Sequence, residues 1–229
     1  ALVLTLLWLA GSGSLIALFP REAAAESGAA ATATAPGAGG EAQAAAPAAG
    51  QPKVLSAAQK ADFDRWYAAQ PVTPVVVAND GAKVVIMKFN DYQCPPCRQT
   101  YLNYKKVLQQ FTASHPGQVK FITRDFPLDP ECNTGGPHQA GCEAAAAVRM
   151  ARQKGRAEAL EDWLFDNQPA MNPDLVRQGV RQVAGVTDFD ARYAAVLEQV
   201  KGDIRYGQSL GVNRTPTFFI NGRKIEGGL

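Results

Sequence analysis

The sequence predicts an α/β fold, because strand-like and helix-like patterns alternate along residues 53–229 around one pair of cysteines. A short apolar, β-branched run at 84–89 is typical of a strand buried in such a sheet. It leads to the motif Cys94-Pro95-Pro96-Cys97. Beyond it, apolar residues recur three or four positions apart, which predicts a helix with one apolar face: Tyr101, Tyr104, Leu108 and Phe111. The cysteines therefore lie where a strand passes into the N-terminus of a helix.

That position favours redox chemistry. The first turn of a helix carries unpaired N–H groups and the positive end of the helix dipole. A thiolate is the reactive form of cysteine, and this environment should lower the pKa of Cys94. Cys97 lies one turn further along and can attack a mixed disulfide formed by Cys94. Pro95 and Pro96 suit the first helical positions, which need no N–H donor.

The composition fits one globular domain with additional segments. The chain has 229 residues and a net charge of +2, and a domain usually takes about 100–200 residues. The near-neutral charge gives no reason to expect a nucleic-acid partner. The four cysteines form two close pairs, and the second pair, Cys132 and Cys142, has a wider spacing that favours an oxidising compartment.

The first 52 residues are predicted to lie outside the folded domain. Residues 1–19 are apolar and uncharged, and as a helix they would measure roughly 28 Å, about one hydrocarbon thickness. We expect a transmembrane helix or, alternatively, the apolar core of a signal peptide with small residues at 23–25. Residues 20–52 are rich in Ala, Gly and Pro, which predicts a disordered linker. Either reading places the domain outside the cytoplasm, and the first anchors it to the membrane.

The remaining elements follow from local signals. Ser56 and Gln59 form a capping box at the start of a helix that Pro71 ends. Asp188 is a candidate N-cap and Pro173 suits a first helical position. Strands are predicted at 75–78, 83–90 and 119–124, so that strand, helix and strand form a βαβ unit. Helices are predicted at 142–154, 157–167, 173–184 and 189–206, within a helical insertion at about 137–210.

The sheet is predicted to resume after the insertion. Residues 217–220 and 223–226 read as strands on either side of Asn221-Gly222, a strong hairpin signal. A sheet that stopped there would leave part of one face uncovered. We therefore expect a C-terminal helix that is missing from the given sequence.

This order of elements resembles the thioredoxin fold of the DsbA-like disulfide oxidoreductases. The resemblance covers about residue 75 to the end and rests on two separate signals, the cysteine motif and Thr215-Pro216 before a hairpin. It implies a cis peptide bond at Pro216, packed against the active-site disulfide, and a substrate-docking role for Thr215. It also implies an enzyme whose only redox group is its own disulfide and whose substrates are proteins with cysteine thiols.

A narrower resemblance is to the thioredoxin-like domains fused to bacterial vitamin K epoxide reductase homologues. It rests on residues 88–93 ahead of the cysteine pair, on 126–129 followed by Cys132, and on the segment 138–145. It implies a membrane-embedded reductase as partner, with residues 1–19 as its last transmembrane helix. Quinone would then enter only through that partner, as the acceptor for reoxidation.

Lys88 departs from the thioredoxin pattern, in which a buried carboxylate stands six residues before the first active-site cysteine. A cation there would favour the thiolate and make the disulfide more oxidising. It also puts a carboxylate-based proton relay in doubt. Alternatively, the Lys88 side chain reaches the surface and has little effect.

Other residues leave alternatives open. Cys132 and Cys142 are expected to form a structural disulfide, or else a second redox pair that relays electrons. His138 could tune Cys142 or a nearby thiol, but a lone histidine in a loop is typically solvated. Three aromatic residues beside strands are expected in the core, although they could line a substrate groove: Tyr92, Phe126 and Phe218.

The predicted function is thiol–disulfide exchange in the cell envelope, with disulfides introduced into substrate proteins through Cys94 and Cys97. The same fold could instead serve as a reductase or isomerase. A different class of function, a metal-binding or structural extracytoplasmic module, would need the two cysteine pairs or His138 to hold zinc. No metal site is predicted.

Overall fold

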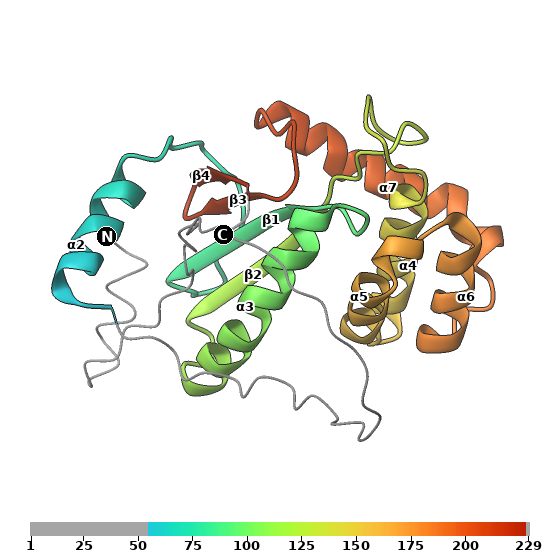
Figure 1. Ribbon diagram of the computed structural model, residues 1–229, viewed down its shortest axis with the longest axis horizontal. Coiled ribbons are helices and arrows are strands. Elements are labelled where there is room, and N and C mark those ends of the chain that lie inside the picture. The colour runs from blue at the N-terminus through green and yellow to red at the C-terminus, as the bar shows by residue number, and fades with distance from the viewer. Residues whose placement is uncertain (1–54, 228–229) are drawn as a thin grey trace, which may run out of the picture.

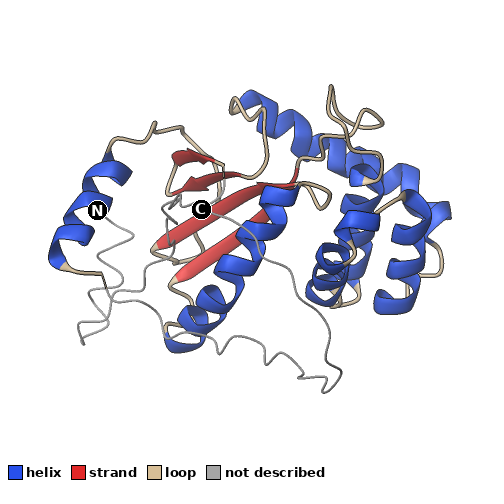
Figure 2. Cartoon of the chain, viewed as in Figure 1, coloured by secondary structure: helices blue, strands red, loops and turns tan. Residues whose placement is uncertain are grey.

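Four strands form one mixed sheet at the centre of residues 55–227, the part of the chain that this computed structural model describes (Figures 1 and 2). β1 (Val84–Asn90) is parallel to β2 (Val119–Asp125) and antiparallel to β3 (Thr217–Ile220), and β4 (Arg223–Glu226) pairs with β3. The predicted βαβ unit and hairpin are confirmed. The apolar segment 1–19 and the linker 20–52 lie outside the described residues.

Helices cover both faces of the sheet and build the predicted insertion. α3 lies across one face, while α4, α5 and α6 stand together at one end of the sheet, on the right in Figure 1. None of the described helices is long and apolar enough to cross a membrane. Their bounds are α2 (Ala57–Ala68), α3 (Pro95–Ser114), α4 (Gly141–Gln153), α5 (Ala157–Asp166), the short 3₁₀ helix η1 (Gln168–Ala170), α6 (Pro173–Ala184) and α7 (Phe189–Ser209).

Local capping explains where several helices begin. The Ser56 and Gln59 capping box of α2 is present in both directions. At α6, the Asn172 side chain accepts from the Leu175 N–H and Pro173 takes the first helical position. Asp188 precedes α7 as expected, but its side chain makes no capping hydrogen bond and instead lies 3.6 Å from Arg192 as an ion pair.

The predicted strand at 75–78 is wrong. This segment is extended but belongs to no strand, and the sheet edge gains only an isolated bridge between Val72 and Arg223. Pro74 has no N–H to donate, so a ladder that starts at Val72 cannot continue through it. Val75 packs against the core, while Val76 is 91% exposed.

The period of two along β1 divides the core into two faces. Val84 and Ile86 pack with the α3 side, whereas Met87 and Phe89 pack with α7 on the opposite face. Lys88 falls on the same face as Val84 and Ile86, and it is fully buried there. The alternation therefore directs a lysine into the apolar layer beneath α3.

Candidate active site

Cys94 and Cys97 occupy the first turn of α3, directly after β1. Cys94 is the N-cap residue with an extended backbone, and Pro95 and Pro96 fill the first two helical positions. The carbonyl of Cys94 accepts from the N–H groups of Cys97 and Arg98 at 3.0 and 3.2 Å. Both thiols are free, with Cys94 5% exposed and Cys97 fully buried. The outer thiol is therefore the one that a substrate can reach.

Thr215-Pro216 lies against the outer thiol. Because β3 runs antiparallel to β1, with Thr217 opposite Phe89, the residues that precede β3 meet those that follow β1. The peptide bond between Thr215 and Pro216 is cis, as the resemblance implied. The Cys94 thiol donates to the Thr215 carbonyl oxygen at 3.2 Å. Sheet register thus brings together two motifs that are far apart in the sequence.

The two thiols have opposite acidities. A hydrogen bond from the Cys97 thiol lowers the pKa of Cys94 from 9.0 to about 6, against the opposing effect of burial. Burial raises the pKa of Cys97 well above its usual range, and the positive charge of Lys88 only partly offsets this. In the reduced protein, a Cys94 thiolate is therefore held by a neutral Cys97 thiol.

Lys88 lies beneath the first turn of α3 and contacts the backbone of Cys97. Its Nζ donates to the Tyr104 hydroxyl at 3.2 Å and to the Cys97 carbonyl oxygen at 3.5 Å. The side chain is 1% exposed, so the alternative in which it reaches the surface is wrong. Burial lowers the pKa of Lys88, while the charges of Cys97 and Glu161 act in the opposite sense.

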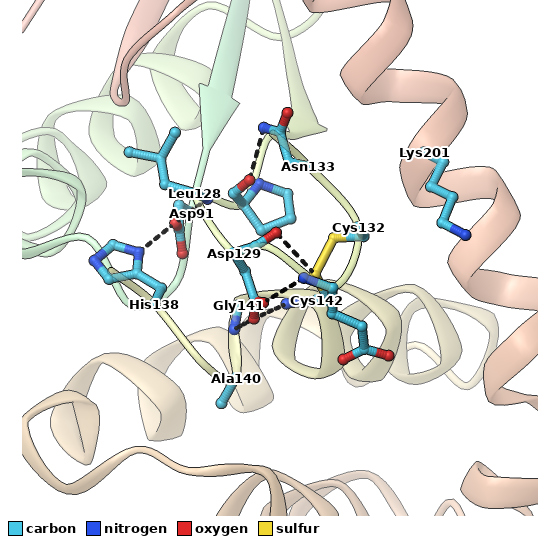
Figure 3. Close-up of a disulfide and its surroundings, with 12 residues drawn as sticks. Asp91, Leu128, Asp129, Cys132, Asn133, His138, Ala140, Gly141, Cys142 and Lys201 are labelled. Atoms are coloured by element: carbon cyan, nitrogen blue, oxygen red, sulfur yellow. Dashed lines mark hydrogen bonds and ion pairs between the residues drawn. A yellow bond between two sulfur atoms is a disulfide. The ribbon is translucent and has the colours of Figure 1, made fainter. Parts of the chain in front are cut away.

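Asp91 joins the loop of the cysteine motif to the loop that precedes α4. Its side chain accepts from the Gln93 and Leu128 N–H groups at 2.8 and 2.7 Å, and its carbonyl accepts from the Cys94 N–H. His138 Nδ1 lies 2.6 Å from Asp91 Oδ2 (Figure 3). This hydrogen bond raises the pKa of His138. His138 is thus partnered with Asp91 and remains partly exposed, and among the thiols it is Cys94, not Cys142, whose charge acts on it.

Cys132 and Cys142 form a disulfide across the same loop (Figure 3). Cys142 lies in the first turn of α4, where the Asp129 carboxylate accepts from the N–H groups of Gly141 and Cys142 at 2.9 and 3.3 Å. Because Cys132 and Cys142 are bonded to each other, their sulfurs cannot complete a zinc site with Cys94 and Cys97. Among residues 55–227, no group of His, Cys, Asp and Glu is arranged to hold a metal.

The three aromatic residues next to strands are in the core. Tyr92, Phe126 and Phe218 are all buried, as expected. Phe126 also borders a surface pocket of about 390 Å³, together with Leu128 and Val212.

Three polar residues near the thiols were not predicted. The Asp91 side chain accepts from the N–H group two residues further on, as in an Asx turn. Of the three residues, only Asp91 is of a type and in a position that could have indicated its role from the sequence. Glu161 accepts from the Tyr92 hydroxyl at 2.8 Å. Gln168 donates to the Tyr92 and Cys94 carbonyls at 2.7 and 3.1 Å. Both come from the helical insertion, and no local pattern places them beside the cysteines.

A family model described as thioredoxin matches residues 70–229. The chain belongs to this thioredoxin family. The region that the family model matches includes the whole described sheet and the helical insertion. The predicted thioredoxin-like fold with a helical insertion is therefore confirmed.

Solved structures show the same fold. A thioredoxin-like oxidoreductase from Silicibacter pomeroyi is 24% identical with a TM-score of 0.52, over 70% of this chain and 84% of that one. A variant of alpha-DsbA1 from Wolbachia pipientis is 16% identical with a TM-score of 0.54, over 69% of this chain and 86% of that one.

Curated relatives are much longer proteins. The Na(+)/H(+) antiporter NhaA 1 of Mycolicibacterium vanbaalenii is 25% identical over 64% of this chain and 23% of its own length. NhaA 3 of Salinispora tropica is 28% identical over 64% of this chain and 21% of its own length. The chain thus spans about a quarter of these relatives.

Proposed function

We propose that this thioredoxin-family domain is a thiol–disulfide oxidoreductase that oxidises dithiols of substrate proteins through Cys94 and Cys97. One observation carries the proposal: the outer thiol has a pKa of about 6 and lies against the Thr215 carbonyl. A thiolate stabilised in the reduced state makes the corresponding disulfide a stronger oxidant. The acidity of Cys94 therefore favours oxidation over the reverse direction.

The reaction begins on the Cys94–Cys97 disulfide. A substrate thiolate attacks Cys94 Sγ, a substrate–Cys94 bond forms, and the electron pair of the broken bond goes to Cys97. A second substrate thiolate then attacks the substrate sulfur of this mixed disulfide. The substrate leaves with its own disulfide and Cys94 leaves as a thiolate. Thr215-Pro216, beside Cys94, would dock the substrate chain.

We place the domain in the cell envelope, tethered to the membrane through residues 1–19. The Cys132–Cys142 disulfide fits an oxidising compartment. Its curated relatives are antiporters, which move ions across a membrane, and the matched region is only a fraction of their length. This supports a domain joined to a membrane protein. The resemblance to fused vitamin K epoxide reductase homologues points to a quinone-linked reductase as the partner that reoxidises the pair, with no cofactor in this domain.

A glutathione redox titration tests the direction of electron flow. The protein is equilibrated at a series of glutathione ratios, and alkylated thiols are counted by mass. We expect the Cys94–Cys97 pair to titrate near the value of about −120 mV typical of strong oxidants, whereas about −270 mV would indicate a reductase. Uptake of stoichiometric zinc without any thiol exchange would support the non-enzymatic alternative instead.

A further inference from the structure

Lys88 is a cation held among aromatic rings. Its Nζ lies 5.2, 5.9 and 6.0 Å from the ring centroids of Tyr104, Phe165 and Phe218. Its two hydrogen-bond acceptors, the Tyr104 hydroxyl and the Cys97 carbonyl, are both neutral. Burying a charge without a bonded counter-ion is costly, and an apolar side chain would fill this space without that cost. A buried ionisable group in contact with a reactive centre is a candidate for proton transfer.

Cys97 needs such a group. It is 0% exposed, and opening of the disulfide would leave its sulfur as a thiolate in a site where burial opposes negative charge. Solvent does not reach the sulfur directly. Lys88 approaches the same residue from the strand below, and its ammonium carries the proton that this sulfur lacks.

Glu161 is the carboxylate whose charge acts on Lys88. It projects from α5 of the helical insertion, is only partly buried, and accepts from the Tyr92 hydroxyl at 2.8 Å. Burial lowers the pKa of Lys88 and raises that of Glu161, and the opposite charge of each group partly offsets the shift of the other.

We propose that Lys88 gives a proton to Cys97 when the Cys94–Cys97 disulfide opens and takes it back when the disulfide re-forms, with Glu161 as the carboxylate that keeps Lys88 charged between these events. This rests on the proposed thiol–disulfide exchange and specifies its proton transfer. As the substrate–Cys94 bond forms and the Cys94–Cys97 bond breaks, the electron pair on Cys97 Sγ accepts a proton from the Lys88 ammonium. Neutral Lys88 then regains a proton from solvent, and the charge of Glu161 favours this protonated form.

The groups that face Lys88 fix the expected pH dependence. Cys94, Cys97 and Tyr104 face it from α3 and Glu161 from α5, while β3 contributes only the Phe218 ring. Lys88 must be protonated to donate. The opening rate, corrected for the ionisation of the attacking thiol, should therefore fall as pH rises through the pKa of Lys88, which burial lowers from 10.5.

The experiment follows opening of the disulfide in the full chain. Oxidised protein is mixed with dithiothreitol and quenched with an alkylating agent, and modified Cys97 is counted by mass across a pH series in H₂O and D₂O. In Lys88→Met, we expect the corrected rate to drop about 10²-fold, and its pH dependence and solvent isotope effect to disappear. In Glu161→Gln, the fall in rate should move to lower pH, because the charge that raises the pKa of Lys88 is gone.

Matched controls come from α3 and α5, the two helices that face Lys88. Lys105 of α3 pairs with Asp162 of α5 at 2.5 Å, so Lys105→Met removes a lysine that bridges these helices away from the thiols. Glu158→Gln removes an exposed carboxylate one turn before Glu161. Both controls should keep the wild-type rate and pH profile.

Each outcome separates this inference from the proposed function. No opening of the disulfide in the wild-type protein would overturn thiol–disulfide exchange itself. Opening in Lys88→Met at the wild-type rate would leave exchange standing and overturn the role of Lys88. A slower Lys88→Met that keeps the pH dependence and isotope effect would also overturn it, since the lysine would then only support packing. If Lys88→Met does not fold, an unshifted profile in Glu161→Gln decides against the proposal.

Discussion

The Cys94 sulfur and the Thr215 carbonyl oxygen lie 3.2 Å apart, although 121 residues separate them in the chain. The contact exists because β3 pairs with β1 in antiparallel register and begins two residues after Thr215. A backbone segment with its own polar groups therefore forms one wall of the site. This wall borders the outer thiol of the pair.

Cys94→Ser is expected to abolish dithiol oxidation, because the sulfur that receives the substrate is lost. The assay measures disulfide formation in a reduced peptide with two cysteines by mass. Cys97→Ser is the control for a folded site, because it keeps the Cys94 thiol, which iodoacetamide should still alkylate. Full oxidation of the peptide by Cys94→Ser would contradict the mechanism.

The reduced protein should gain stability with rising pH through Cys94. The pKa of this thiol is lowered from 9.0 to about 6 in the folded state, so its contribution is fully present above the unfolded pKa and is lost as pH falls through about 6. Urea denaturation under reducing conditions compares the wild type with Cys94→Ser across this range. The difference in free energy of unfolding should grow from low to high pH, and a constant difference would contradict the assigned acidity.

The double variant Cys132→Ser/Cys142→Ser should lower the free energy of unfolding. The disulfide closes a loop with a sequence separation of 10, which by chain entropy contributes roughly 2–3 kcal/mol. Urea denaturation of the oxidised proteins measures the change. The glutathione titration separates the two roles: a staple stays oxidised throughout, while a relay pair titrates in the same range as Cys94–Cys97.

Two glycines in α7 should respond oppositely to alanine. A Cβ at Gly207 would lie 2.8 Å from ring atoms of Phe126 and Phe89, so Gly207→Ala should destabilise the protein by about 1–3 kcal/mol. A Cβ at Gly202 would meet only the end of Arg205 at 4.0 Å, so Gly202→Ala should stabilise it by about 0.5–1 kcal/mol. Thermal or urea unfolding measures both. Similar effects of the two substitutions would show that α7 does not pack on Phe89 and Phe126 as described.

Local patterns in the sequence determined most of the elements and the position of the cysteine pair. The apolar run before Cys94, the prolines after it, the capping box at Ser56 and the Asn221-Gly222 turn each act over a few residues. Their preferences therefore hold wherever the segment lies in the fold. The parallel pairing of β1 with β2 followed from the βαβ pattern, whereas the antiparallel pairing of β1 with β3 was not predicted.

The tertiary structure decided what surrounds the thiols. Lys88 is buried because β1 alternates, but its partners come from α3, α5 and β3, and the Asp91–His138 contact joins two loops. Residues 75–78 show the converse, since their apolar run before a turn predicted a strand, yet Pro74 left them without a strand partner. Periodicity is a property of the chain alone, whereas pairing, burial and pKa shifts depend on which distant side chains pack together, and only the folded arrangement fixes those.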